Sequence, residues 1–237
     1  MAQCDLILLH APHVYDFRSK TILYGPVSDL VPASPVFEMY PIGLASIAEY
    51  LEHSGYRVRI VNLAVRMLND RNFDAEAFIK RLRSPIFGID LHWLVHAHGA
   101  VEVARLVKKH HPEAKVVMGG LSASYFYREL FNYPEIDYVI RGDSTEEPFG
   151  QLMDSIKNRR LPEAVPNLVW RDDKGNMREN PFSHVPDDLS SVMVNHYTSI
   201  IRSVIRHRDL ISITPVKDWL RYPITATLTC RGCSQNC

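Results

Sequence analysis

Four stretches of the chain place apolar residues at positions i, i+3, i+4 and i+7, which is the spacing of one face of an α-helix. These stretches begin at Leu44, Ala75, Ala100 and Phe149. Between and before them lie short apolar runs bounded by Pro, Gly or Asp, a pattern typical of strands that are buried on both faces of a parallel sheet. The runs occupy residues 6–9, 58–63, 86–89, 116–118 and 138–140.

Strand and helix alternate through the first 160 residues, and we expect one more helix around residues 122–132. Such alternation predicts an α/β fold in which crossover helices cover both faces of a parallel sheet. The predicted architecture is a doubly wound, Rossmann-like sheet of five parallel strands, with the strand order 2-1-3-4-5.

The pattern changes after Arg160, where four prolines at positions 162, 166, 181 and 186 interrupt any long helix. Residues 167–179 predict a β-hairpin with arms at 168–170 and 177–178 and a turn at 173–176 that contains Gly175. A helix is expected within residues 190–208, and the strict apolar and hydroxyl alternation of residues 224–230 predicts a strand with unlike faces. We therefore divide the chain into a domain at 1–160, a connector at 161–222 and the start of a second domain at 223–237.

Composition excludes several function classes for this 237-residue chain. Its 27 Lys and Arg balance 27 Asp and Glu, so no overall field draws it to nucleic acid or anionic lipid. No apolar run approaches the roughly 18 residues that span a bilayer, and the amino terminus lacks a secretion signal. Neither GxGxxG after a strand nor GxxxxGK[ST] is present. We expect a cytoplasmic protein that binds neither nucleic acid nor membrane.

Three of the four cysteines, Cys230, Cys233 and Cys237, lie within the last eight residues. Clustered thiols in a chain without an export signal favour metal or redox chemistry over disulfides. Cys233 and Cys237 form a Cys-x3-Cys pair directly after the predicted strand, an arrangement from which loop thiolates can reach one iron–sulfur cluster. Two free thiols or half of a zinc site remain alternatives.

The strand followed by RGCSQNC resembles the opening of the radical S-adenosylmethionine barrel, whose cluster loop reads Cys-x3-Cys-x2-Cys. The third cysteine would fall three residues beyond Cys237, so the resemblance implies a chain truncated within that loop. Earlier segments resemble the cobalamin-binding domain that precedes the barrel in one branch of the superfamily. They are DLILLHAP at 5–12, YPIGL at 40–44, the pair Gly119-Gly120, and DYVIRGD at 137–143. Residues 167–181 resemble the hairpin connector of these proteins.

The resemblance implies an enzyme that contains cobalamin and a 4Fe-4S cluster and uses S-adenosylmethionine. Cys233 and Cys237 would be cluster ligands, and S-adenosylmethionine would bind the fourth iron. An electron donor such as ferredoxin or flavodoxin would trigger cleavage to a 5'-deoxyadenosyl radical that takes hydrogen from an unknown small-molecule substrate. Cobalamin would then supply a methyl group or assist a rearrangement. Because two cysteines give an incomplete ligand set, we expect this fragment alone to be inactive.

The corrinoid pocket is expected beyond the carboxyl ends of the strands, where open parallel sheets bind ligands. Gly119 and Gly120 lie at such an end, and their missing side chains would let a bulky cofactor approach the backbone. Asp90, His92 and Gly142 complete the predicted cofactor-binding set.

The predicted pocket departs from the pattern of methyltransferases that ligate cobalt through Asp-x-His-x-x-Gly after the first strand. Asp90-Leu91-His92 carries Asp-x-His after the third strand instead, and Val95 stands where glycine is needed. We expect His92 to be hydrogen-bonded to Asp90 rather than to touch the cobalt face. Trp93 could form a floor for the corrin, but we expect it to be buried, and the axial ligand of cobalt stays open.

Two other function classes fit parts of the sequence. A corrinoid-binding module without catalysis would pass a methyl group between partners and would lack a third cysteine. A zinc- or thiol-bearing regulatory domain on a flavodoxin-like fold would bind neither cobalamin nor a cluster.

Overall fold

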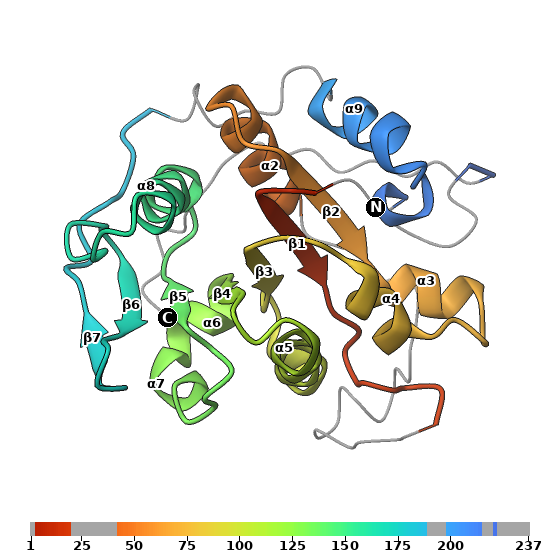
Figure 1. Ribbon diagram of the computed structural model, residues 1–237, viewed down its shortest axis with the longest axis horizontal. Helices are drawn as coiled ribbons and strands as arrows, with labels where there is room; N and C mark the ends of the chain where they lie inside the picture. Colours follow the sequence, from red (N-terminus) through yellow and green to blue (C-terminus); the bar gives the residue numbers. More distant parts are fainter. Residues whose placement is uncertain (1–2, 20–41, 189–197, 215–219, 222–237) are drawn as a thin grey trace.

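The computed structural model describes residues 3–19, 42–188, 198–214 and 220–221. Within these residues the chain forms a mixed sheet in the order β2-β1-β3-β4-β5-β6-β7, with helices on both faces (Figure 1). The α/β prediction is confirmed, and so is the order of the parallel strands. The predicted number of strands is wrong, because the sheet has seven strands rather than five.

The parallel part of the sheet consists of five short strands. They are β1 (Leu6–His10), β2 (Val58–Asn62), β3 (Ile86–Asp90), β4 (Lys115–Gly119) and β5 (Tyr138–Ile140). β1 lies between β2 and β3, with Leu8 in register with Ile60 on one side and Gly88 on the other. The carboxyl ends of β1, β3, β4 and β5 therefore meet at one edge of the sheet.

The two additional strands are the arms of the predicted hairpin, β6 (Leu168–Arg171) and β7 (Met177–Glu179). Gly175 has φ of 80° and its N–H donates to the carbonyl of Asp172 at 2.8 Å, as expected for the turn. β6 pairs antiparallel with β5, so the hairpin extends the sheet of residues 1–160. Sequence periodicity identified the hairpin but carries no information about which strand it joins.

Eight α-helices and two 3-10 turns lie among the described residues. They are α2 (Gly43–His53), α3 (Leu63–Asn69), α4 (Ala75–Arg81), η1 (Leu94–His96), α5 (Ala97–His110), α6 (Leu121–Tyr125), α7 (Tyr127–Leu130), α8 (Glu146–Lys157), α9 (Thr198–His207) and η3 (Ile211–Ile213). The four apolar stripes correspond to α2, α4, α5 and α8. The helix expected at 122–132 is divided into α6 and α7 at Phe126. α3 was not predicted. Asn62 is the last residue of β2, and its side chain caps the start of α3 by accepting a hydrogen bond from the Val65 N–H at 3.0 Å.

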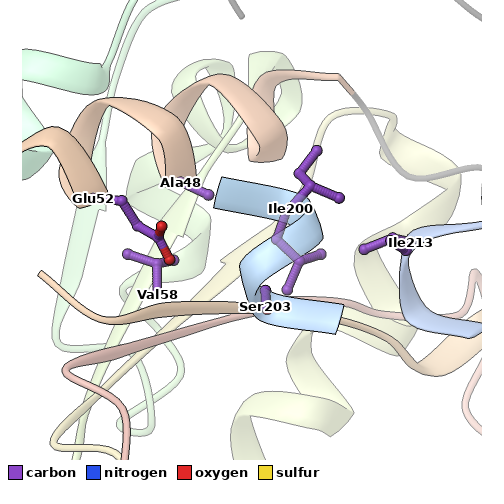
Figure 2. A pocket seen from close by; sticks show the side chains of 7 residues that line it. Ala48, Glu52, Val58, Ile200, Ser203 and Ile213 are labelled. Carbon is purple, nitrogen blue, oxygen red and sulfur yellow. The ribbon is translucent and has the colours of Figure 1, made fainter. Parts of the chain in front are cut away.

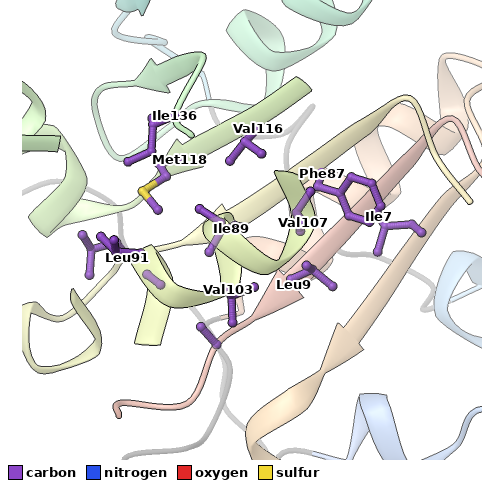
Figure 3. Close-up of a cluster of buried hydrophobic side chains, with 14 of the residues drawn as sticks. Ile7, Leu9, Phe87, Ile89, Leu91, Val103, Val107, Val116, Met118 and Ile136 are labelled. Carbon is purple, nitrogen blue, oxygen red and sulfur yellow. The ribbon is translucent and has the colours of Figure 1, made fainter. Parts of the chain in front are cut away.

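Alternate residues of β1 enter two separate cores, as expected for a strand covered on both faces. Ile7 and Leu9 pack with Phe87 against the side of α4 and α5 (Figure 3). Leu6 and Leu8 pack on the opposite face against α2 and α8. The central strands are thus fixed from both sides, which gives the carboxyl edge a rigid base.

The outer edge of β2 is covered by α9 and η3. Asp209, two residues after the end of α9, is buried and accepts hydrogen bonds from Arg59 of β2 at 2.8 Å and from Arg66 of α3. A narrow cavity between α2, β2 and α9 is lined by Glu52, Ser203 and apolar side chains (Figure 2). Burial raises the pKa of the Glu52 carboxyl. The helix predicted within 190–208 is confirmed for residues 198–207, and residues 190–197 lie outside the described residues.

No helix in the described part of the chain combines the length and the apolar content that crossing a bilayer requires.

Candidate functional site

The carboxyl edge of the sheet brings several predicted site residues together. Asp90 ends β3 and Gly119 ends β4, and the two residues are direct partners in the parallel ladder. Gly119 is in turn the partner of Ile140 at the end of β5, two residues before Gly142. The strand ends therefore place these residues along one line, where the loops diverge and ligands of open parallel sheets bind.

Asp90 is bonded to a histidine, but the histidine is not the expected one. The Nδ1 of His10, the last residue of β1, lies 3.0 Å from both carboxylate oxygens of Asp90. Both side chains are buried, with exposed fractions of 1% and 6%. The expectation that His92 bonds Asp90 is thus wrong. Because an ionised carboxylate only accepts, Nδ1 carries the proton of this bond, and the pair ties the ends of β1 and β3 together.

A series of rings leads from the His10–Asp90 pair to the surface. The His96 ring is buried, with its centroid 5.3 Å from that of His10, and the Trp93 ring lies 6.3 Å from His96. Trp93 is 42% exposed, so the expectation of a buried tryptophan is wrong. His92 is half-buried beside Trp93, at a centroid distance of 6.1 Å, and its carbonyl accepts from the Ser122 hydroxyl at 3.0 Å.

The structure constrains the neighbouring Gly119 and Gly120 differently. Gly120 has φ of +107°, and a Cβ there would lie 2.8 Å from backbone atoms of Leu91 and His92. The close approach of two loops therefore requires it. Among the described residues, a Cβ on Gly119 would meet only the Ile140 carbonyl oxygen, at 3.8 Å. The described part of the fold therefore does not need a glycine at 119 and leaves space beside the backbone there.

Gly142 lies at a turn where other residues of the protein occupy the space beside the backbone. Its φ is +108°, its N–H donates to the Ser124 hydroxyl at 2.9 Å, and a Cβ there would lie 3.5 Å from the Phe182 ring. The neighbouring Arg141 is buried and donates to Glu179 of β7 at 2.6 Å. This turn fastens the β5 loop to the hairpin.

The loop after β1 closes the amino terminus of α5. The Gly99 N–H donates to the His13 carbonyl at 3.2 Å, and a Cβ on Gly99 would lie 1.6 Å from the Pro12 carbonyl oxygen. Phosphate groups commonly bind at such a helix terminus because its N–H groups point outward. Here loop backbone fills that place, which agrees with the absence of a phosphate-binding motif.

Exposed apolar side chains lie in the segments that follow β3 and β4, the strands that end at Asp90 and Gly119. They are Trp93, Leu94, Leu121 and Tyr125, with exposed fractions of 42%, 52%, 51% and 77%. Grouped apolar exposure of this kind marks ligand or partner surfaces. A strand that ends in glycine, together with these exposed apolar side chains, fits a large, flat, uncharged ligand.

Within the described ranges, no group of three or more His, Cys, Asp and Glu side chains has the geometry to hold a metal ion. Cys233, Cys237 and the predicted strand at 224–230 lie outside the described residues.

Comparison with known families identifies the ligand class. A family model described as the B12 binding domain matches residues 29–149, which include β3, β4 and the strand end at Gly119. The chain belongs to the B12-binding domain family. The exposed apolar side chains and the glycine at the strand end thus lie within a domain of the family that binds cobalamin.

Two curated relatives match this B12-binding chain at 26% identity. Hopanoid C-3 methylase from Methylococcus capsulatus aligns over 167 residues, 67% of this chain and 31% of that protein. Cytidylyl-2-hydroxyethylphosphonate methyltransferase from Streptomyces wedmorensis aligns over 185 residues, 69% of this chain and 34% of that protein. The chain therefore spans about a third of the length of these relatives.

Two solved enzymes share the fold. The radical S-adenosylmethionine methyltransferase TsrM from Kitasatospora setae, with cobalamin and a [4Fe-4S] cluster bound, has a TM-score of 0.55 and 18% identity, covering 76% of this chain and 31% of TsrM. The cobalamin-dependent radical enzyme OxsB, with aqua-cobalamin and S-adenosylmethionine bound, has a TM-score of 0.56 and 12% identity, covering 87% of this chain and 26% of OxsB. At these identities the likeness supports the fold.

Proposed function

We propose that this chain is the cobalamin-binding part of a radical S-adenosylmethionine enzyme and that it holds cobalamin at the carboxyl edge of its sheet. The observation that carries the proposal is the glycine at the end of β4, beside which the described residues leave space, together with the exposed apolar side chains that follow β3 and β4. Gly119 and those side chains lie within the residues that match the B12-binding family, where a corrin ring needs both a close backbone approach and exclusion of water.

The chain's own residues would serve the cofactor in three ways. Gly119 leaves room for the macrocycle, and Leu121 and the neighbouring apolar side chains shield it from water. The His10–Asp90 pair holds the β1 and β3 ends in register and keeps a proton on His10 Nδ1. When bound, cobalamin supplies the methyl-carrying chemistry of its cobalt.

The proposal extends to the residues beyond the described part of the chain. Cys233 and Cys237 would bind a 4Fe-4S cluster together with a third cysteine three residues further on in the natural protein. The cluster would bind S-adenosylmethionine and accept an electron from a donor such as ferredoxin or flavodoxin. The small-molecule substrate would then be methylated or rearranged. Support comes from the curated relatives, whose names describe a methylase and a methyltransferase.

Incubation with hydroxocobalamin, followed by desalting, tests the first half of the proposal. We expect a coloured protein fraction with close to one cobalamin per chain. Gly119→Val should fold normally and lose the colour, because its side chain fills the space above the strand end. Ile205→Ala, on the exposed face of α9, is the matched control and should stay coloured. A colourless wild-type fraction would refute cobalamin binding.

Anaerobic loading of the full natural gene product with iron and sulfide tests the second half. We expect the absorption of a 4Fe-4S cluster, and its loss in Cys233→Ala and Cys237→Ala, because a cluster needs its thiolate ligands. Cys4→Ala is the control, since Cys4 is buried at the start of β1. An uncoloured sample would contradict the cluster assignment without affecting the cobalamin result.

A further inference from the structure

Trp93 differs from the other tryptophan that the structure describes. Trp170 is 5% exposed and donates its indole N–H to the Asn180 side chain at 3.1 Å. Trp93 is 42% exposed on the loop directly after β3. Tryptophan is the largest apolar side chain, and leaving it in water forfeits burial energy that a bound partner would recover.

The exposed Trp93 residue is nevertheless restrained by a backbone hydrogen bond and by a neighbouring buried ring. The His96 N–H donates to the Trp93 carbonyl at 3.0 Å, which closes the 3-10 turn of η1. The His96 ring packs between the rings of Trp93 and His10, and His10 is fixed by Asp90. A surface side chain whose support is buried to within a few per cent is preorganised, so binding would cost it little conformational entropy.

We propose that Trp93 is a contact surface for the corrin ring and that His96, His10 and Asp90 are positioning residues that hold its indole in place. This inference rests on the proposed function, because it concerns the same edge of the sheet. The chemistry of the two partners agrees. A corrin offers a broad apolar face and a rim of amide carbonyls, while an indole offers a broad apolar face and one N–H donor.

The surroundings of Trp93 favour an uncharged ring over other occupants. The exposed side chains between the ends of β3 and β4 and the helices that follow include Leu94, Leu121 and Tyr125, which carry no charge at neutral pH. The first exposed charged side chains after β4, Arg128 and Glu129, lie in α7, and Asp143 is exposed after β5. A phosphate or carboxylate ligand would need cationic side chains or open helix N–H groups. The start of α5, the nearest helix in sequence, is closed by the β1 loop.

Chemical footprinting of the whole chain tests the contact directly. The indole reagent 2-hydroxy-5-nitrobenzyl bromide is applied with and without saturating hydroxocobalamin, and modification is located by peptide mass spectrometry. We expect labelling of Trp93 to fall roughly five-fold or more with cobalamin bound, because a covered ring is inaccessible to the reagent. Trp170 should stay unlabelled in both samples and serves as the internal reference.

The two possible failures are distinguishable. If the desalted protein retains cobalamin while Trp93 is labelled as fast as in the free protein, the contact is refuted and the proposed function survives. If no cobalamin is retained, the proposed function and the inference are both refuted.

Variants separate contact from a merely structural role. Trp93→Ala should weaken hydroxocobalamin binding roughly ten-fold or more, whereas Trp93→Phe should recover most of the affinity because it restores an aromatic face. Ile205→Ala removes an apolar side chain of α9 that is more exposed than Trp93, at 72%, and should leave binding unchanged.

The positioning role of His96 predicts an effect on Trp93 that can be measured in the cofactor-free protein. His96→Ala should increase the reagent's access to Trp93 and lower the fluorescence anisotropy of its indole, since the supporting ring is gone. Unchanged labelling and anisotropy in His96→Ala, or unchanged cobalamin affinity in Trp93→Ala, would overturn the assignment.

Discussion

Replacing Gly120 by alanine places a methyl group against the backbone that connects β3 to η1. The new Cβ would lie 2.8 Å from the Leu91 carbonyl group and from the His92 nitrogen, and these are backbone atoms that cannot rotate away. The residue would also have to keep φ near 107° and ψ near 172°, a region that is essentially restricted to glycine and costs an L-residue roughly 1–3 kcal/mol. Overpacking adds about 1–3 kcal/mol.

The expected loss of unfolding free energy is therefore about 2–6 kcal/mol. At roughly 2–4 °C per kcal/mol for a chain of this size, it corresponds to a fall in Tm of roughly 4–24 °C. The assay is urea unfolding followed by circular dichroism, with thermal unfolding as a second measurement.

Gly119→Ala is the matched control, one residue earlier in the same strand end. Among the described residues its Cβ would meet only a carbonyl oxygen at 3.8 Å, so we expect unchanged or slightly higher stability, since alanine in a strand gains roughly 0.5–1 kcal/mol over glycine. Its cobalamin affinity should fall nevertheless. If Gly120→Ala unfolds within about 1 kcal/mol of the wild type, or Gly119→Ala is the less stable of the two, the division of roles between the glycines is wrong.

Three further predictions concern the α9 edge and the pH dependence of stability. Asp209→Ala should cost about 3–5 kcal/mol in urea unfolding, because it leaves the buried Arg59 without its carboxylate. Glu102→Ala breaks the partly exposed pair with Arg105 and should cost under about 1 kcal/mol; equal losses would contradict the burial argument. Burial holds the pKa of His207 at about 4, below its usual 6.5, so the unfolded chain binds this proton more readily. Stability should fall as pH drops from about 6.5 to 4, by the order of 1 kcal/mol after solvent screening. His207→Gln should flatten this part of the profile of Tm against pH, and an unchanged slope would show that another group titrates.

The strand and helix pattern could be predicted because it depends on which residues avoid water. Each apolar stripe became a helix over nearly the predicted residues, and the parallel strands have the predicted order. Asn62 shows where prediction from hydrophobic periodicity fails. Periodicity continued the strand to residue 63, but the Asn62 side chain caps α3 and ends the strand there.

The candidate site was predicted in part. The predicted strand ends do meet at one edge of the sheet, where Asp90 and Gly119 are neighbours in the ladder, and ligand binding at this edge stays a prediction. The partner of Asp90 was missed, although a signal existed: His10 and Asp90 are both polar residues at the ends of strands that the predicted order places side by side. Sequence proximity favoured His92 instead, yet the partner comes from the adjacent strand β1, whose last residue lies beside the end of β3.

The sequence by itself determined the α/β class and the succession of strands and helices along the chain, because hydrophobic period is a local property. Only the tertiary structure decided that the hairpin extends the sheet, that Gly120 serves the fold while Gly119 leaves space, and that Trp93 faces solvent above a buried His10–Asp90 pair. Those outcomes depend on distances between atoms far apart in the chain, which no periodicity encodes.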